Sequence, residues 1–240
     1  MFKYAAFALA ALTEQAMANY YSGEVKTWET FEYGKFRTAM KTGNHYGTVA
    51  SFFTYWNGPN WSVGQWNEID VEIVPSVQHQ GKQPFSTNII YGDGHNGKRE
   101  EQSYKDFHDW TKYHIYEIEW TPDYIRWTID GQEVRKSSAH DSAGVRFTNK
   151  AQHIMMNFWT PTWDSWGHGR NDYDMPWYVY YDWVEVYSYD HSRKNFNLKW
   201  RDDFNGGNNS GVDGSKWQVS DNWTFESNSS TFVKNHVYIW

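Results

Sequence analysis

The 240-residue chain contains no cysteine, so it offers no disulfide framework, no thiol nucleophile and no zinc–thiolate site. Positive charge is also scarce. Lys and Arg number 22 against 29 Asp and Glu, which gives a formal net charge of −7. The basic residues are scattered, whereas a nucleic-acid partner would require a basic face. We therefore expect no nucleic-acid partner, and a neutral polymer is a better match.

The chain also lacks an apolar run long enough to cross a membrane, which needs roughly twenty residues. At the start, Lys3 precedes a run of only about ten apolar residues, and the segment ends in Ala16-Met17-Ala18. This order is typical of a secretory signal peptide, with an ordinary N-terminal helix as the alternative. We predict a signal peptide over residues 1–18, then a single secreted domain over residues 19–240 that is monomeric and has no membrane partner.

After residue 20 no 3.6-residue apolar periodicity persists long enough for a substantial helix. Short runs rich in β-branched and aromatic residues recur instead, for example at 47–55 and 114–120. Asp130-Gly131 between two alternating segments predicts a β-hairpin, and residues 231–240 also resemble a strand. Many short strands without repeats predict an all-β fold, a two-sheet antiparallel β-sandwich of the jelly-roll kind.

Aromatic residues make up 20% of the chain and include 16 Trp. Trp stacks on sugar rings because their C–H groups meet the negative face of the indole. The alternative is that most of these Trp residues belong to the core of a β protein. Both interpretations stand at this point.

Residues 66–74 place Glu68, Asp70 and Glu72 on one face of a strand and aliphatic residues on the other. Three acids in a row repel one another, so at least one pKa should be raised. Such splitting allows one carboxyl group to act as an acid while another stays ionised. The strand is therefore a candidate for catalysis by paired carboxylates.

Spacing alone leaves the mechanism open. On a flat strand the two Glu α-carbons lie roughly 13 Å apart, whereas retaining and inverting glycosidases need carboxyl groups about 5–5.5 Å and about 6.5–9.5 Å apart. A solvated strand face and a divalent-metal site are alternatives. Glu117-Ile-Glu119 has the same alternation and is a competing candidate.

Trp66-x-Glu68-Ile-Asp70-Val-Glu72 resembles the active-site signature of glycoside hydrolase family 16, in the E-x-D-x-E form of its lichenases. Further segments resemble lichenase sequences and occur in the same order as in lichenases. They lie on both sides of this motif, at 33–36, 47–49, 55–58, 88–90, 114–116, 119–122 and 127–135. The resemblance implies a concanavalin A-like sandwich with a substrate cleft on its concave face. It also implies retaining endo-hydrolysis of mixed-linkage β-1,3-1,4-glucan with no catalytic cofactor. Glu68 would be the nucleophile, Glu72 the general acid/base and Asp70 the residue that holds and tunes the nucleophile.

The order of the motifs resembles that of circularly permuted members of this family. In most members, motifs like those at 200–204 and 222–225 begin the domain, whereas here they come last. The resemblance therefore implies that the two ends of the domain lie close together. The permuted order favours a lichenase over two related alternatives, enzymes that act on laminarin or xyloglucan. A non-catalytic lectin-like sandwich is a third alternative.

The resemblance also extends to binding residues. Positions that match sugar contacts are Glu24, Phe53, Tyr55, Asn57, Trp66, Asn88, Asn157, Trp159, Trp166 and Trp223. Asp182 and Asp203 match a structural calcium site found in lichenases, for which oxygen ligands are suitable. Met155 and Ser86 depart from the lichenase pattern, so the linkage specificity follows less directly than the hydrolase class.

Overall fold

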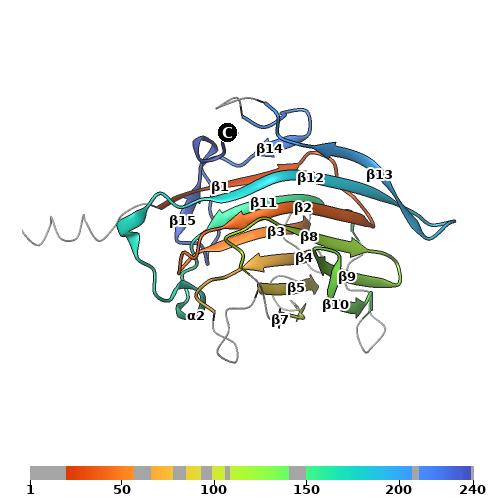
Figure 1. Cartoon of the computed structure of the whole chain (residues 1–240), viewed down its shortest axis with the longest axis horizontal. Helices are drawn as coiled ribbons and strands as arrows, with labels where there is room; N and C mark the ends of the chain where they lie inside the picture. Colours follow the sequence, from red (N-terminus) through yellow and green to blue (C-terminus); the bar gives the residue numbers. More distant parts are fainter. Residues whose placement is uncertain are drawn as a thin grey trace, which may run out of the picture.

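The computed structural model describes residues 20–56, 66–77, 85–92, 99–105, 109–140, 150–206 and 211–238. The predicted signal peptide and Asn57 therefore lie outside the described residues. Strands dominate what is described, and they form two stacked sheets (Figure 1). Helical structure in these ranges is limited to three short turns, α2 (Asp164–Gly167), η1 (Asp172–Asp174) and η2 (Lys234–His236). None of the described helices has the length and apolar character needed to cross a membrane.

The first sheet has nine strands. Its main path runs β14 (Trp217–Val219), β1 (Tyr20–Thr27), β11 (His153–Trp159), β3 (Val49–Trp56), β4 (Trp66–Ile73), β5 (Phe85–Gly92) and β6 (Arg99–Glu100). Off this path, β15 (Ser230–Phe232) pairs with β1, and β7 (Ser103–Lys105) pairs with β5. The strand that carries the three acids, β4, thus lies between two neighbours well inside the sheet.

The second sheet has six strands. They run in the order β10 (Gln132–Ser138), β9 (Tyr124–Ile129), β8 (His114–Trp120), β2 (Gly34–Thr42), β12 (Val179–Asp190) and β13 (Asn195–Asp202). The expected all-β, two-sheet sandwich is confirmed. Its strand pairings are antiparallel, except that β15 runs parallel to β1.

The core lies between the sheets and holds β4 in place. Ile69, Val71 and Ile73 of β4 are at most 1% exposed and pack in the same cluster as Trp127 of the six-stranded sheet. Each such large apolar side chain contributes about 1.5–3 kcal/mol on burial. The Trp127 indole Nε1–H also donates to the backbone carbonyl of Asp70 at 2.9 Å. This hydrogen bond between the sheets leaves the acidic side chains of β4 on the outer face.

Two local expectations have different outcomes. The predicted hairpin is confirmed, because β9 and β10 are joined by Asp130 and Gly131 with φ values of 49° and 78°, as a type I′ turn requires. The strand predicted over 231–240 is confirmed only at its start, since β15 ends at Phe232 and η2 follows, and residues 239–240 lie outside the described residues. The turn packs against β1, where a Cβ on Gly23 would lie 2.5 Å from a backbone oxygen of His236. The close approach therefore depends on glycine at position 23.

Candidate active site

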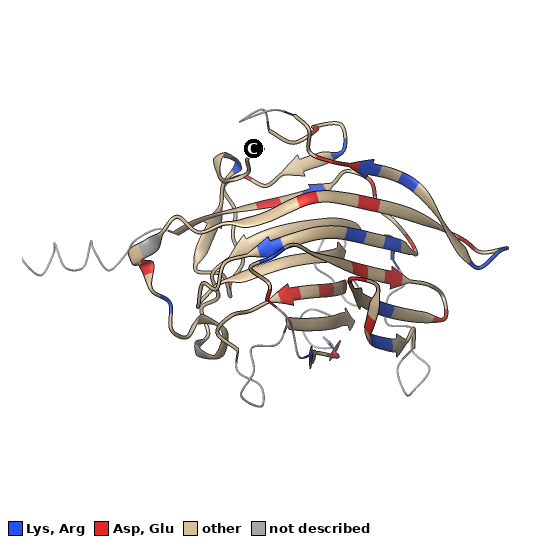
Figure 2. Cartoon of the chain, viewed as in Figure 1, with Lys and Arg blue, Asp and Glu red and all other residues tan. Residues whose placement is uncertain are grey.

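The outer face of the nine-stranded sheet carries Glu68, Asp70 and Glu72, and we call it the carboxylate face. β3 and β5 pair with β4 on its two sides, so the side chains opposite the acids share this face. From β3 these are Tyr55, Phe53 and Ser51, and from β5 they are Ile90, Asn88 and Ser86. Acidic positions colour both β4 and β8 red in Figure 2, although the two strands belong to different sheets.

Asp70 is the most buried of the three acids, with 3% exposure. Burial raises its pKa well above the usual range, and the negative charges of Glu68 and Glu72 raise it further. Asp70 also shares a hydrogen bond with Glu68. Its Oδ1 is buried without a hydrogen-bond partner in the described part of the chain. A protonated Asp70 therefore donates to the Glu68 carboxylate.

Glu68 has a second donor on its own strand. The Trp66 indole Nε1–H donates to Glu68 Oε2 at 2.5 Å. The Trp66 ring in turn meets Tyr55 edge-on, with 6.5 Å between the ring centroids. Two donors and an aromatic contact hold Glu68 in one orientation and stabilise a negative charge on it. Such a carboxylate suits attack on an electrophilic carbon.

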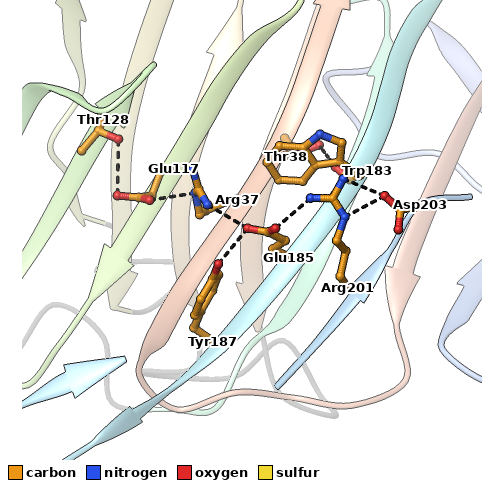
Figure 3. A network of polar contacts seen from close by, with 9 residues as sticks. All are labelled: Arg37, Thr38, Glu117, Thr128, Trp183, Glu185, Tyr187, Arg201 and Asp203. Carbon is orange, nitrogen blue, oxygen red and sulfur yellow. Dashed lines mark hydrogen bonds and ion pairs between the residues drawn. The ribbon is translucent and has the colours of Figure 1, made fainter. Parts of the chain in front are cut away.

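The competing acidic pair, Glu117 and Glu119, has a different environment, which Figure 3 shows for Glu117. Glu117 lies on the outer face of the six-stranded sheet, where Arg37 Nε is 3.0 Å from its Oε2. Glu119 makes an ion pair with Arg126 at 2.7 Å. Both carboxylates are thus neutralised by arginines on adjacent strands. Among described residues, no group of three or more His, Cys, Asp or Glu side chains is placed to hold a metal ion.

Another carboxylate on the carboxylate face, Glu24 of β1, is almost fully buried. The Ser220 hydroxyl donates to it at 2.7 Å and the Asn157 amide at 3.1 Å, while Trp223 provides a further hydrogen bond. Burial raises the pKa of Glu24, and the hydrogen bonds from these three donors lower it by less, so the pKa stays raised. Three of the predicted sugar-contact residues are therefore in one polar cluster. Ser220 had no motif to reveal it, and only the folded sheet brings it here.

The predicted stacking residues divide into two kinds. Trp159 and Trp166 are 7% and 8% exposed and belong to an apolar cluster with Phe232, against which Trp163 packs. Trp223 is 41% exposed. The interpretation of Trp as core therefore applies to Trp159 and Trp166. Trp223 is exposed enough to contact a ligand, and its role as a sugar platform stays a prediction.

Asn88, which stands opposite Asp70, donates from Nδ2 to Glu100 Oε1 at 2.5 Å. Glu100 comes from the two-residue strand β6 and also raises the pKa of Asp70, after burial, Glu68 and Glu72. It was not predicted, because a single exposed acid in polar sequence carries no signal. The pairing of β5 with β6 brings it to the carboxylate face.

The two predicted calcium ligands lie elsewhere. Asp182 is the extra residue of a bulge in β12 and is exposed. Asp203 accepts from Arg201 at 2.7 Å from Nε and forms an ion pair with Nη2 at 2.6 Å. Both line a cavity of about 970 Å³ between β1 and β12. Calcium takes six to eight oxygen ligands, and an aspartate already neutralised by arginine does not fit a carboxylate-based calcium site.

Comparison with known proteins places this geometry in context. The model of glycosyl hydrolases family 16 matches residues 5–184. The chain is 35% identical over 242 residues to a beta-glucanase of Fibrobacter succinogenes, covering 97% of this chain and 65% of that protein's length. It is similar in structure to a Bacillus licheniformis beta-glucanase, with a TM-score of 0.52, 29% identity and coverage of 69% and 70% of the two chains. A lichenase from a mouse hindgut metagenome has a TM-score of 0.51 and 28% identity, covering 70% of this chain and 78% of its own.

The family match includes β4 and both strands that pair with it, so the three acids lie in the part of the chain that carries the likeness. The sandwich, the acidic strand and the sequence match agree with one another. The chain belongs to glycosyl hydrolases family 16.

Proposed function

We propose that this protein is a retaining endo-β-glucanase that hydrolyses mixed-linkage β-1,3-1,4-glucan by double displacement. The observation that carries the proposal is the arrangement on β4, where the buried Asp70 is hydrogen-bonded to Glu68 and Glu72 lies on the same face. Relatives that are named beta-glucanase and lichenase support the choice of substrate.

In the first step, the Glu68 carboxylate attacks the anomeric carbon while Glu72 protonates the glycosidic oxygen, which leaves with its half of the chain. In the second step, Glu72 takes a proton from water, and the water oxygen displaces Glu68 with net retention. The donors from Asp70 and Trp66 orient Glu68 for the attack. Asp70 keeps its proton because burial and two neighbouring carboxylates disfavour a third negative charge.

The cluster around Glu24 supports a site that binds a polymer across several strands. Glu24 lies on β1 and Asn157 on β11, and β3 separates them from β4. Hydroxyl-bonding and aromatic groups thus extend away from the reacting centre. Binding at a distance can be used to orient and distort the reacting sugar, so it raises turnover as well as affinity.

Product analysis tests the proposal. We expect rapid release of tri- and tetrasaccharides from barley β-glucan and lichenan, with little action on laminarin, xyloglucan or short cellobiosides. Proton NMR of the first products should show the β-anomer before mutarotation. Glu68→Gln serves as the control for contaminating activity. Rapid cleavage of laminarin or xyloglucan alone would overturn the substrate, and initial α-products would overturn the retaining mechanism.

We further propose that the domain is circularly permuted. The pairing of β1 with β15 puts Tyr20 opposite Ser230, so the first and last strands lie side by side. The family model ends at residue 184, yet β13, β14 and β15 complete the two sheets. Close termini are the condition under which permutation is tolerated. A variant that joins the two ends and opens the chain before the segment at 200–204 should fold and keep activity.

Secretion is also part of the proposal and rests on the N-terminal sequence. Expression of the whole chain in a bacterial host should release a protein that begins at residue 19, as mass spectrometry of the culture medium would reveal. Retention of residues 1–18 in the mature protein would overturn it.

A further inference from the structure

Strand pairing arranges the carboxylate face in rows that run across the sheet. One row contains Glu72, Ser51, Asn157 and Glu24, in that order across β4, β3, β11 and β1. The next row contains Asp70, Phe53, Met155, Lys26 and Gln218. A polymer that crosses the strands would meet each row from the carboxylates toward β1. The second row ends in Lys26 and Gln218, two polar residues for which the sequence predicted no role.

Lys26 points to this face because its neighbours Val25 and Thr27 are buried on the core side. It is only half-buried, and it makes no ion pair or side-chain hydrogen bond in the described part of the chain.

The neighbours of Lys26 on this face do not use its donors. Met155, opposite Lys26 on β11, has no hydrogen-bonding group that could accept strongly from an ammonium. The nearby Glu24 carboxylate already accepts from Ser220 and Asn157. Lys26 is therefore a cation with unused donors.

The position of the ammonium group is reflected in its effects on two neighbours. Burial raises the pKa of Glu24, and the charge of Lys26 lowers it slightly. Burial lowers the pKa of His153, and Lys26 lowers it further. These effects agree with the half-buried position of Lys26 in the row next to that of Glu24 and Asn157.

Another half-buried strand lysine provides a contrast. Lys41 of β2 lies over the rings of Tyr113 and Tyr180, 4.7 and 4.9 Å from their centroids. The aromatic faces compensate that ammonium for lost water. Lys26 has no comparable ring contact in the described residues, so a partner that arrives from outside the protein can supply its acceptors.

We propose that Lys26 binds substrate: its ammonium group donates hydrogen bonds to the hydroxyl oxygens of a glucosyl unit held over β1, remote from the cleaved bond. This inference rests on the proposed glucanase function. Three strand spacings, roughly 14 Å in all, separate β1 from β4. A substrate must therefore extend several sugars from the reacting centre to reach Lys26. Lys26 is a determinant of chain-length preference.

The length dependence makes the inference testable. Replacing Lys26 with Met keeps the aliphatic stem and removes the donors. We expect kcat/KM on barley β-glucan to fall about tenfold, as loss of a hydrogen bond from a charged group does. Aryl glycosides too short to reach β1 should be cleaved at the unchanged rate. Lys26→Arg should restore most of the loss, and Lys26→Gln is the second variant if Met impairs folding.

Lys41→Met is the matched control, because it removes an equally half-buried strand lysine from the opposite sheet, and it should leave both substrates unaffected. Equal rates of Lys26→Met and the parent on the polymer would overturn the inference, and so would equal losses on long and short substrates. Failure of the parent protein to cleave any β-glucan is a different result, because it overturns the proposed function itself.

Discussion

Two strands of this protein carry nearly the same acidic pattern and differ in what faces them. On β4, Asp70 lies between Glu68 and Glu72, is buried, and has a raised pKa. On β8, Glu117 and Glu119 each meet an arginine from the neighbouring strand. Burial raises the pKa of Glu117 too, but the charges of Lys35 and Arg37 oppose that rise. For Asp70, burial and the neighbouring carboxylates all act in the same direction and raise its pKa. The alternating acids alone therefore did not distinguish the two strands, and the residues on the neighbouring strands gave them different environments.

The largest expected effect separates the two strands directly. Glu68→Gln and Glu72→Gln should each lower kcat by about a thousandfold or more, because each removes a distinct chemical role. Glu117→Gln and Glu119→Gln should keep kcat within about twofold and lower the melting temperature instead. Steady-state kinetics on barley β-glucan and thermal melts measure both quantities. Loss of turnover confined to the β8 variants would reverse the assignment.

A smaller effect tests the proton on Asp70. Because its folded-state pKa is raised, the folded protein binds this proton more tightly than the unfolded chain does. Stability therefore decreases as pH rises from the ordinary value of 3.8 through the raised value. Asp70→Asn removes this loss and should be more stable than the parent at neutral pH, with the gain vanishing in acid.

The same residue links stability to activity. Asp70→Ala removes the donor to Glu68 and should lower kcat about tenfold to a hundredfold. Asp70→Asn keeps a donor and should retain more activity than the Ala variant. Equal activity of the two variants would contradict a role for Asp70 as a hydrogen-bond donor. Urea unfolding at several pH values and initial rates provide the two readouts.

The smallest effect concerns the network on the six-stranded sheet (Figure 3). Burial alone would raise the pKa of Glu185, but hydrogen bonds from Arg201 and Tyr187 and the charge of Arg37 lower it. A lowered carboxyl pKa contributes stability above the ordinary value of 4.5, and this contribution is lost as pH falls through the lowered pKa. Glu185→Gln should cost about 1–3 kcal/mol at pH 7 and less in acid.

Tyr187→Phe is the matched control for that variant, because it removes one neutral donor to Glu185, 2.9 Å away, and leaves both charges in place. Its cost should be about 0.5–1.5 kcal/mol at pH 7, less than that of Glu185→Gln. The cost should also shrink in acid, because this hydrogen bond contributes to the lowered pKa of Glu185. Neither change should alter kcat. A pH-independent effect of Glu185→Gln would show that the arginine pairs do not stabilise the fold.

The sequence predicted the fold class well because its signals are local. Alternating strands, the Asp130-Gly131 turn and the absence of helical periodicity each act over a few residues. The strand predicted over 231–240 extends only to Phe232, and η2 follows. The lack of a Cβ on Gly23 lets this turn lie close against β1, a contact between segments far apart in the sequence that local signals do not reveal. Resemblance supplied the candidate acids, but it supplied neither Ser220 nor Glu100.

The amino-acid sequence by itself determined which side chains share a face, because alternation along a strand is a property of the backbone. It therefore determined that Glu68, Asp70 and Glu72 point the same way. Only the tertiary structure decided what surrounds them. Pairing of β4 with β3 and β5 buries Asp70. Pairing of β8 with β2 and β9 brings Glu117 and Glu119 into ion pairs with arginines on those strands. A carboxylate's pKa depends on charges and burial that come from distant segments, so only the formed sheets give these acids their different pKa shifts.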